Sequence, residues 1–227
     1  MSLLVPIDLT APSRCAIGLA ARVGRATGEE ALLLHVSDGP TPLDHLAQLH
    51  ALASPLREAG LRARLREVVG APVENICSEA ERRAVRWVIM GTRGHWDSPN
   101  NGQPGSVARG VLAQAPVPVI AVRPPSATCD CWLEDPERQL DHGPRVCVVS
   151  LSGAPLGSTR EIASSLAGAI GGRVVSTGGQ ALSGIEPDLV VAECGADVTE
   201  ERLATVLADL RCPVALVAMP VDPALTH

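Results

Sequence analysis

The chain has 227 residues, 46% of them hydrophobic and 19% charged, a balance that allows a packed core and argues against a disordered chain. Its net charge of −6 at pH 7 argues against a broad surface for nucleic acid or an anionic membrane, and the absence of Phe and Tyr leaves no stacking platform for single strands. No apolar run reaches the roughly 18 residues of a membrane span, Asp8 interrupts what would be the apolar part of a signal peptide, and seven scattered cysteines favour a reducing cytoplasm.

Short apolar runs alternate with segments of helical period over the first half of the chain. The runs predict strands at 3–8, 31–37, 61–69, 86–91 and 117–122, and the segments between them predict helices at 12–28, 43–59, 72–84 and 105–115. Pro55 is expected to interrupt or bend the second helix, and the alternating charges of the third strand suit a half-exposed edge strand. This alternation predicts an α/β fold with an open parallel sheet of five strands, covered by helices on both faces.

Residues 123–144 break the pattern with proline, acidic and polar residues, which indicates a linker or an irregular cover segment. The alternation then restarts, with strands predicted at 145–151, 173–176, 187–193 and 213–218 and helices at 158–172 and 199–210.

The second half is an internal repeat of the first, because 115–124 matches 211–220 and 86–94 matches 188–195. The repeat is shortened, since the region between about 176 and 187 has no room for a helix, a strand and a second helix. We therefore divide the chain into a first α/β domain at 1–124, a linker at 125–144 and an abridged, degenerate second domain at 145–227.

A glycine-studded stretch, VIMGTRGHWDSPNNGQPGSVARGVL (88–112), lies between a predicted strand and a predicted helix. Gly91, Gly94 and Gly105 can bring the backbone close to a ligand, and Ser106 opens a helix whose first amides favour an anion. The stretch has neither the Gly-Lys-Ser/Thr of a Walker loop nor the spacing of a dinucleotide fingerprint. Composition alone therefore favours phosphate binding and a plain flexible loop about equally.

Several motifs follow one another along the first half: VPID (5–8), LLLHV (32–36), GAPVENI (70–76), VIMGTRG (88–94) followed by GS (105–106), and APVPVIAVRP (115–124). With these motifs, residues 1–124 resemble the universal stress protein family, and the second half resembles an eroded copy of the same domain. The resemblance implies a strand order of 3-2-1-4-5 in the first half. It also implies that the two halves pair through their last strands, 117–122 and 213–218, and makes a homodimer of whole chains a further expectation.

The resemblance further implies a small-molecule ligand, ATP or a related adenine nucleotide, with Mg²⁺ as an optional companion. By this resemblance Asp8 and Val36 contact adenine, while Pro6 and Ile7 line the base pocket. The ribose and phosphates would be held by Gly91, Arg93, Gly94, Gly105, Ser106 and Val107. The family's signature has one residue fewer between its second and third glycines than the ten found here, and the extra residue is either absorbed as a bulge or spoils the phosphate site.

These features predict a nucleotide-binding regulator or sensor in the stress response, with an interaction or scaffold protein of the same fold as the alternative. The chain is not expected to be an enzyme, apart from slow and incidental ATP hydrolysis, because no residue is identifiable as a general base. A pyrophosphatase-like loop around Ser150–Ser158 is the weakest alternative. Glu193 stands where the first half has Gly91, so a carboxylate would repel phosphate and the second half is expected to have lost the site.

The histidines and the linker cysteines are expected to have structural roles or none. His35 is expected to be partly buried and hydrogen-bonded, and His45 lies five residues from the next helix histidine, on a different face. Cys129 and Cys131 could meet a soft metal with His142, but they are one residue apart, which is too close for the usual zinc motif. Free thiols are therefore expected, and no metal site is predicted.

Overall fold

The structure is a computed structural model that describes residues 2–92, 104–124, 131–135, 138–150, 157–177, 186–193 and 212–219. The first half contains β1 (Ser2–Pro6), α1 (Ala11–Thr27), β2 (Glu30–Ser37), α2 (Leu43–Ala51), α3 (Ser54–Glu58), β3 (Ala63–Val69), α4 (Pro72–Arg82), β4 (Trp87–Gly91), α5 (Ser106–Gln114) and β5 (Val119–Arg123). The second half contains β6 (Arg145–Ser150), α6 (Gly157–Ala169), β7 (Arg173–Thr177), β8 (Leu189–Glu193) and β9 (Val214–Ala218). These elements match the predicted ones in type and order, and the helix predicted at 199–210 lies outside the described residues.

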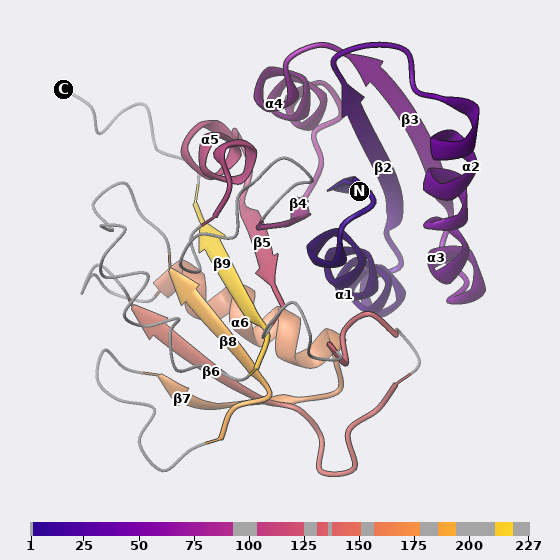
Figure 1. Cartoon of the computed structure of the whole chain (residues 1–227). Helices are drawn as coiled ribbons and strands as arrows, with labels where there is room; N and C mark the ends of the chain where they lie inside the picture. The colour runs from indigo at the N-terminus through magenta and orange to yellow at the C-terminus, as the bar shows by residue number, and fades with distance from the viewer. Residues whose placement is uncertain are drawn as a thin grey trace, which may run out of the picture.

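The strands of the described residues form one sheet in the order β3-β2-β1-β4-β5-β9-β8-β6-β7 (Figure 1). The first five strands are parallel and confirm the expected order 3-2-1-4-5. β5 then pairs with β9 in antiparallel fashion, with Val119 opposite Ala218, which confirms that the two halves meet through their last strands. In the second half, β9-β8-β6-β7 repeats β5-β4-β1-β2, and the described residues contain no counterpart of β3.

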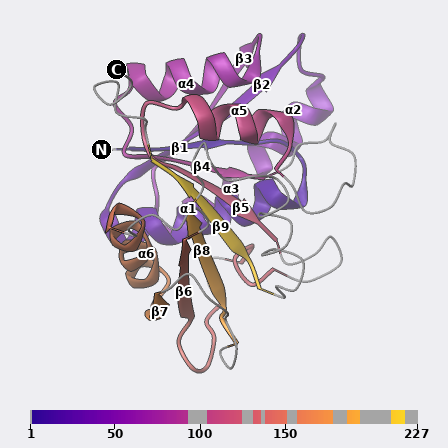
Figure 2. The ribbon, with the colours of Figure 1, turned by 90° about the vertical axis from the view of Figure 1, so that its left-hand side faces the viewer.

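Helices cover both faces of the sheet. Helices α1 and α6 lie together on one face, and α4 and α5 lie together on the other (Figure 2). Each face has its own apolar core, and the neighbouring residues Leu3 and Leu4 of β1 belong to different cores because successive side chains of a strand point to opposite faces. Within the described residues, no helix combines the length and the apolar character needed to span a bilayer.

Proline and glycine mark the helix ends in the way the sequence predicts. Pro12 lies in the first turn of α1, and Gly28 ends this helix with a left-handed φ of 72°. The helix predicted at 43–59 is two helices, because α2 ends at Ala51 and Pro55 lies in the first turn of a new helix, α3. Strand β3 lies at the sheet edge, and none of its residues is fully buried.

The described part of the region between the two halves is a cover segment (residues 131–135 and 138–144). Leu133 is fully buried in the core on the α1 face. The indole Nε1 of Trp132 donates to the carbonyl oxygen of Asp188, just before β8, at 3.1 Å. Of the two alternatives left open by the sequence, a linker or a cover segment, these contacts show a cover segment that joins the halves.

Arg22 of α1 binds the cover segment through its guanidinium group. Its guanidinium donates to the carbonyl oxygens of Asp135 and Arg138 at 2.7 and 2.6 Å, and it lies 5.0 Å from the ring centre of Trp132. A charged side chain that is 6% exposed needs such partners, because an unpaired buried charge is strongly unfavourable. Arg22 therefore ties α1 to the segment along several residues.

Two cysteines meet where the cover segment crosses α1. Cys15 and Cys131 are both buried free thiols, and the Sγ of Cys15 donates to the carboxylate of Glu134 at 3.6 Å. The hydrogen bond to Cys131, burial and the nearby carboxylate raise the pKa of Cys15 far above its ordinary value, so this thiol is neutral. Cys129 lies outside the described residues. Among the described residues, no group of three or more His, Cys, Asp or Glu side chains is arranged to hold a metal ion.

The substitution Gly18→Ala tests the docking of the cover segment on α1. A Cβ at this position would lie 1.6 Å from the carbonyl oxygen of Leu133, so the helix or the segment would have to move. We expect the free energy of unfolding to fall by about 3 kcal/mol in urea denaturation, even though alanine is the better helix former. Gly168→Ala in α6 is the matched control, because its Cβ would meet nothing within 4 Å and should be neutral or stabilising. Equal stabilities of the two variants would contradict this packing.

A buried carboxylate holds α4 against the edge of the sheet. Glu79 accepts hydrogen bonds from Arg82 and Arg83 of its own helix and lies 3.4 Å from a guanidinium nitrogen of Arg66 on β3. Burial acts to raise the pKa of Glu79, but the hydrogen bonds from Arg82 and Arg83 and the charge of Arg66 outweigh it and hold the pKa below its ordinary value. The same helix contributes Ile76 to the cavity described below.

Glu79→Gln is expected to lower the free energy of unfolding by about 1–2 kcal/mol at pH 7. Because the folded-state pKa is lowered, the ionised carboxylate stabilises the fold above the ordinary Glu pKa of about 4.3, and this contribution is lost as the pH falls through the folded-state value. Urea denaturation of both proteins at pH 7 and pH 3.5 should therefore show a difference that shrinks in acid. Glu81→Gln, at an exposed position of the same helix, serves as the control. A gap that widens in acid would show that the carboxylate does not act in this way.

Candidate functional site

A cavity of about 550 Å³ opens at the carboxyl edge of the sheet in the first half of the chain. Its walls come from the ends of β1, β2 and β4 and from the first turns of α2, α4 and α5. The chain runs from β1 to β2 on one side and returns to β4 on the other, so the cavity lies where the strand order reverses. This is the usual place for a ligand in an open α/β sheet.

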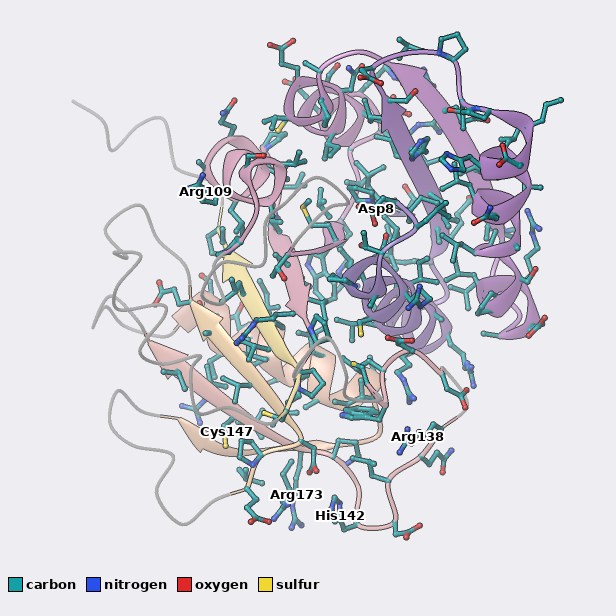
Figure 3. All side chains as sticks on the ribbon, in the orientation of Figure 1. Asp8, Arg109, Arg138, His142, Cys147 and Arg173 are labelled. Atoms are coloured by element: carbon teal, nitrogen blue, oxygen red, sulfur yellow. The ribbon has the colours of Figure 1, made fainter. Side chains whose placement is uncertain are left out.

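Asp8 stands just after β1 in a fixed position and lines the cavity (Figure 3). Its backbone N–H donates to the hydroxyl of Ser13 at 2.9 Å. Its carboxylate accepts hydrogen bonds from the backbone N–H of Thr10, at 3.0 Å, and from the Thr10 hydroxyl. Such a turn, closed by an Asp side chain, leads the chain into α1 and gives the cavity a negatively charged acceptor at a defined place.

His35 on β2 is a structural neighbour of the same corner. Its Nδ1 lies 3.0 Å from the carbonyl oxygen of Ile7, and because a carbonyl can only accept, the proton belongs on Nδ1. The residue is half-buried, as the sequence predicts. Ile7 is in turn fixed by the hydrogen bond from its backbone N–H to Leu34, at 2.9 Å, so the floor of the cavity is held by both strands.

The segment between β2 and α2 forms a wall that the sequence analysis did not identify. Ser37, Asp38 and Thr41 line the cavity, and the hydroxyl of Ser37 donates to the carbonyl oxygen of Gly39 at 2.6 Å. His45 of α2 lines it as well. The signal was present, because SDGPTP directly follows a predicted buried strand, and ligand sites of parallel sheets lie beyond the carboxyl ends of several neighbouring strands.

Helix α5 turns its amino end towards the cavity, where Val107 and Ala108 form part of the wall. Gly105 is the N-cap and has no side chain with which to cap the helix, and the first turn contains no acidic residue. The first amides of an α-helix have no acceptor inside the helix and together carry about half a positive charge. An anionic group of a ligand is therefore stabilised at this end of the cavity.

The glycines of the predicted phosphate site have packing roles in the described residues. A Cβ on Gly91 would lie 2.8 Å from the Cβ and the carbonyl carbon of Pro12, so glycine is needed for the close approach of α1 to the end of β4. Gly105 has an extended φ of −66°, which any residue adopts, and its N–H donates to the carbonyl oxygen of Thr92 at 2.7 Å. The N–H of Gly105 is therefore engaged within the protein, whereas Gly91 lines the cavity, and a role of these glycines in holding phosphates stays a prediction.

The residues implied by the family resemblance fall into three groups. Those that line the cavity are Pro6, Ile7, Asp8, Val36, Gly91 and Val107. Gly105 and Ser106 begin α5 beside Val107 but are not among the described lining residues. Arg93 and Gly94 lie outside the described residues. The structure thus brings the expected base-pocket residues together, and the assignment of residues to the phosphates stays a prediction.

The second half offers a different environment at the corresponding place. Glu193 ends β8, which is the counterpart of β4, and it lies opposite Ser150 of β6 and Val217 of β9. It is half-buried. Residues 194–211, which would complete the comparison with α5, lie outside the described residues, so the expected loss of a second site stays a prediction.

Comparison with known proteins is consistent with this architecture. The model of the universal stress protein family matches residues 1–123. A solved structure of a functionally unknown protein from Pseudomonas aeruginosa is 17% identical, covers 96% of this chain and 92% of its own, and has a TM-score of 0.60. A universal stress protein from Archaeoglobus fulgidus is 18% identical, with coverages of 97% and 98% and a TM-score of 0.53.

A further universal stress protein from Archaeoglobus fulgidus, solved in complex with dAMP, covers 54% of this chain and 98% of its own at 22% identity and a TM-score of 0.45. No curated protein sequence matches this chain. Because the family model covers more than half of the sequence, the chain belongs to the universal stress protein family. The two matches over nearly the whole chain show that its fold is a tandem α/β repeat.

Gly91→Ala is expected to destabilise the protein by about 1–3 kcal/mol, because the added methyl group forces the first turn of α1 away from β4. Gly39→Ala is a matched control in the same cavity wall, since its Cβ would meet nothing within 4 Å and its backbone is not left-handed. Its effect should stay within about 0.5 kcal/mol. Thermal denaturation measures both variants. If Gly91→Ala is as stable as the control, its glycine is not required for helix packing.

Proposed function

We propose that this chain binds an adenine nucleotide in the cavity of its first half and that binding makes it a regulator or sensor in the stress response. The proposal rests on the layout of that cavity, which has apolar walls, a fixed carboxylate at the end of β1 and the amino end of α5. Membership of the universal stress protein family supports the stress-related role. The cavity is large enough for a small organic ligand and lies where α/β sheets bind nucleotides.

The base is proposed to lie among the apolar side chains of the cavity. Ile7, Val36, Ile76 and Met90 contribute to its lining and offer surfaces against which a flat ring can pack. Asp8 is a hydrogen-bond acceptor, and the amino group of adenine is a donor, whereas guanine has a carbonyl oxygen at the same position. A carboxylate in this corner therefore favours adenine.

The phosphate end of the nucleotide is proposed to lie at α5. The amides of its first turn are suited to an anion, and Val107 places this turn in the cavity wall. A Mg²⁺ ion, where one accompanies the nucleotide, would be held by the phosphates, because the described residues offer no group of three ligands for it.

We propose binding without efficient turnover. The polar groups nearest to β1 have structural partners: the carboxylate of Asp8 accepts from Thr10, and Nδ1 of His35 is held by the carbonyl of Ile7. A general base must reach the proton that it removes, and these groups are instead arranged to fix the cavity wall. Slow ATP hydrolysis would then be incidental to the role of the protein.

Substitution within the cavity wall tests the proposed site. Val36→Trp fills the cavity and should weaken AMP binding at least tenfold in isothermal titration calorimetry, because the base loses its space. Val69→Trp, on the neighbouring strand β3 and 61% exposed in the wild type, should leave binding unchanged. AMP should also raise the Tm of the wild type and of Val69→Trp, but not of Val36→Trp.

The competing proposal, a scaffold protein with an empty cavity, predicts that no adenine nucleotide binds. In that case neither adenosine nor any of its phosphates would produce heat or a Tm shift at millimolar concentration. Equal binding by Val36→Trp and the wild type would place the ligand elsewhere. Either result would remove the proposed nucleotide site.

A further inference from the structure

The charges around the cavity bear on which nucleotide it can hold. Asp8 and Asp38 line it, and no Lys or Arg is among its described lining residues. His35 and His45 also line the cavity, and Nδ1 of His35 is directed at the carbonyl oxygen of Ile7. The described wall is therefore acidic at neutral pH, although a phosphorylated ligand is an anion.

The backbone amides near the end of β4 are largely engaged with other parts of the protein. The N–H of Thr92 donates to the carbonyl oxygen of Val122 at 3.0 Å, and the N–H of Gly105 donates to the carbonyl oxygen of Thr92 at 2.7 Å. These two residues bracket the segment 93–104, and neither amide is available to a phosphate. What remains on the described wall is the first turn of α5, with about half a positive charge.

The basic side chains of the described residues that Figure 3 labels lie away from the Asp8 corner of the cavity. Arg109 is the basic residue of α5, and Figure 3 shows it on the side of the helix away from Asp8. Arg138, His142 and Arg173 lie at the far end of the molecule from Asp8 in the same view. The sequence between the two bracketing residues contains Arg93 and Asp97 and no lysine, and residues 93–103 lie outside the described residues.

We propose that the cavity selects adenine nucleotides with a single phosphate over those with two or three. One phosphate can lie at the amino end of α5, where the helix favours an anion. Each further phosphate adds negative charge to a site that has two carboxylates and no matching cation among its described lining residues. This inference rests on the proposed function, since it specifies the ligand class of the same cavity.

Titration calorimetry of the full chain with adenosine, AMP, ADP and ATP, in EDTA and at low ionic strength, tests this selection. We expect AMP to bind at least tenfold more tightly than ATP, with ADP in between. The ratio of AMP affinity to ATP affinity should fall as NaCl is raised, because salt screens the repulsion between the phosphates and the carboxylates of the cavity. ATP binding that equals or exceeds AMP binding would overturn the inference and leave the proposed function standing. Failure of all four ligands to bind would overturn both.

Two matched pairs of variants locate the effect. Asp38→Asn removes a charge at nearly constant shape and should raise ATP affinity about threefold or more while changing AMP affinity less. Asp38→Glu keeps the charge, so its preference for AMP over ATP should resemble that of the wild type.

Val107→Glu adds a carboxylate to the first turn of α5. It should weaken AMP binding at least tenfold but leave adenosine binding unchanged. Val107→Gln, which matches the size of Glu without its charge, should weaken AMP binding clearly less than Val107→Glu does. If Val107→Glu and Val107→Gln bind AMP equally, the phosphate does not lie at α5 and the inference fails.

Discussion

The close packing of α1 is the constraint on which the rest of the structure depends. This helix packs on the end of β4, where Gly91 leaves room for Pro12, and it passes beneath the cover segment, where Gly18 leaves room for the backbone at Leu133. Its amino end is set by the turn at Asp8, which is also a wall of the cavity. The same rigid element therefore fixes one corner of the candidate site and the junction between the two halves.

The second half is held to the first by strand pairing, by the cover segment and by the packing of α6 on α1. β5 and β9 pair in antiparallel fashion and bury two strand edges that would otherwise be open to solvent or to other chains. The cover segment adds side-chain contacts between α1 and the start of β8, through Trp132 and Arg22. These interfaces use β9, α6 and the residue just before β8, and the described residues of the second half contain no counterpart of β3. The packing of the two halves therefore does not depend on a counterpart of β3.

Most of the fold could be predicted from the sequence, because the apolar periodicity and the positions of proline and glycine indicate the same boundaries of helices and strands. Apolar runs and helical periods located the described strands and helices, and Pro55 correctly marked a break between two of them. The sequence left open whether residues 123–144 form a linker or a cover segment. Its proline-rich and acidic composition is typical of a linker, and its burial depends on long-range partners such as Arg22, which no local pattern reveals.

The candidate site was predictable only in part, for a similar reason. Residues next to the predicted strand ends, such as Asp8 and Val36, do line one cavity. The segment from Ser37 to Thr41 carries no glycine signature and no family motif, so its place in the cavity wall could not be predicted from sequence spacing. A cavity wall is made by loops that follow several strands, and the distances between such loops are set by tertiary packing rather than by sequence spacing.

The glycines show why a sequence signature and a binding site are not the same evidence. Gly91 is required by the close approach of Pro12 in α1, which packs on β4, and the N–H of Gly105 donates to the carbonyl oxygen of Thr92. Both roles would exist in a relative that binds nothing, so the glycine pattern by itself indicates the geometry of the sheet edge. The chemistry of a ligand is decided by the groups that face it, which here are carboxylates, apolar side chains and the first turn of one helix. Under the proposed function, that combination suits an adenine ring better than a long chain of phosphates, because the described wall offers apolar surface and a hydrogen-bond acceptor but no Lys or Arg.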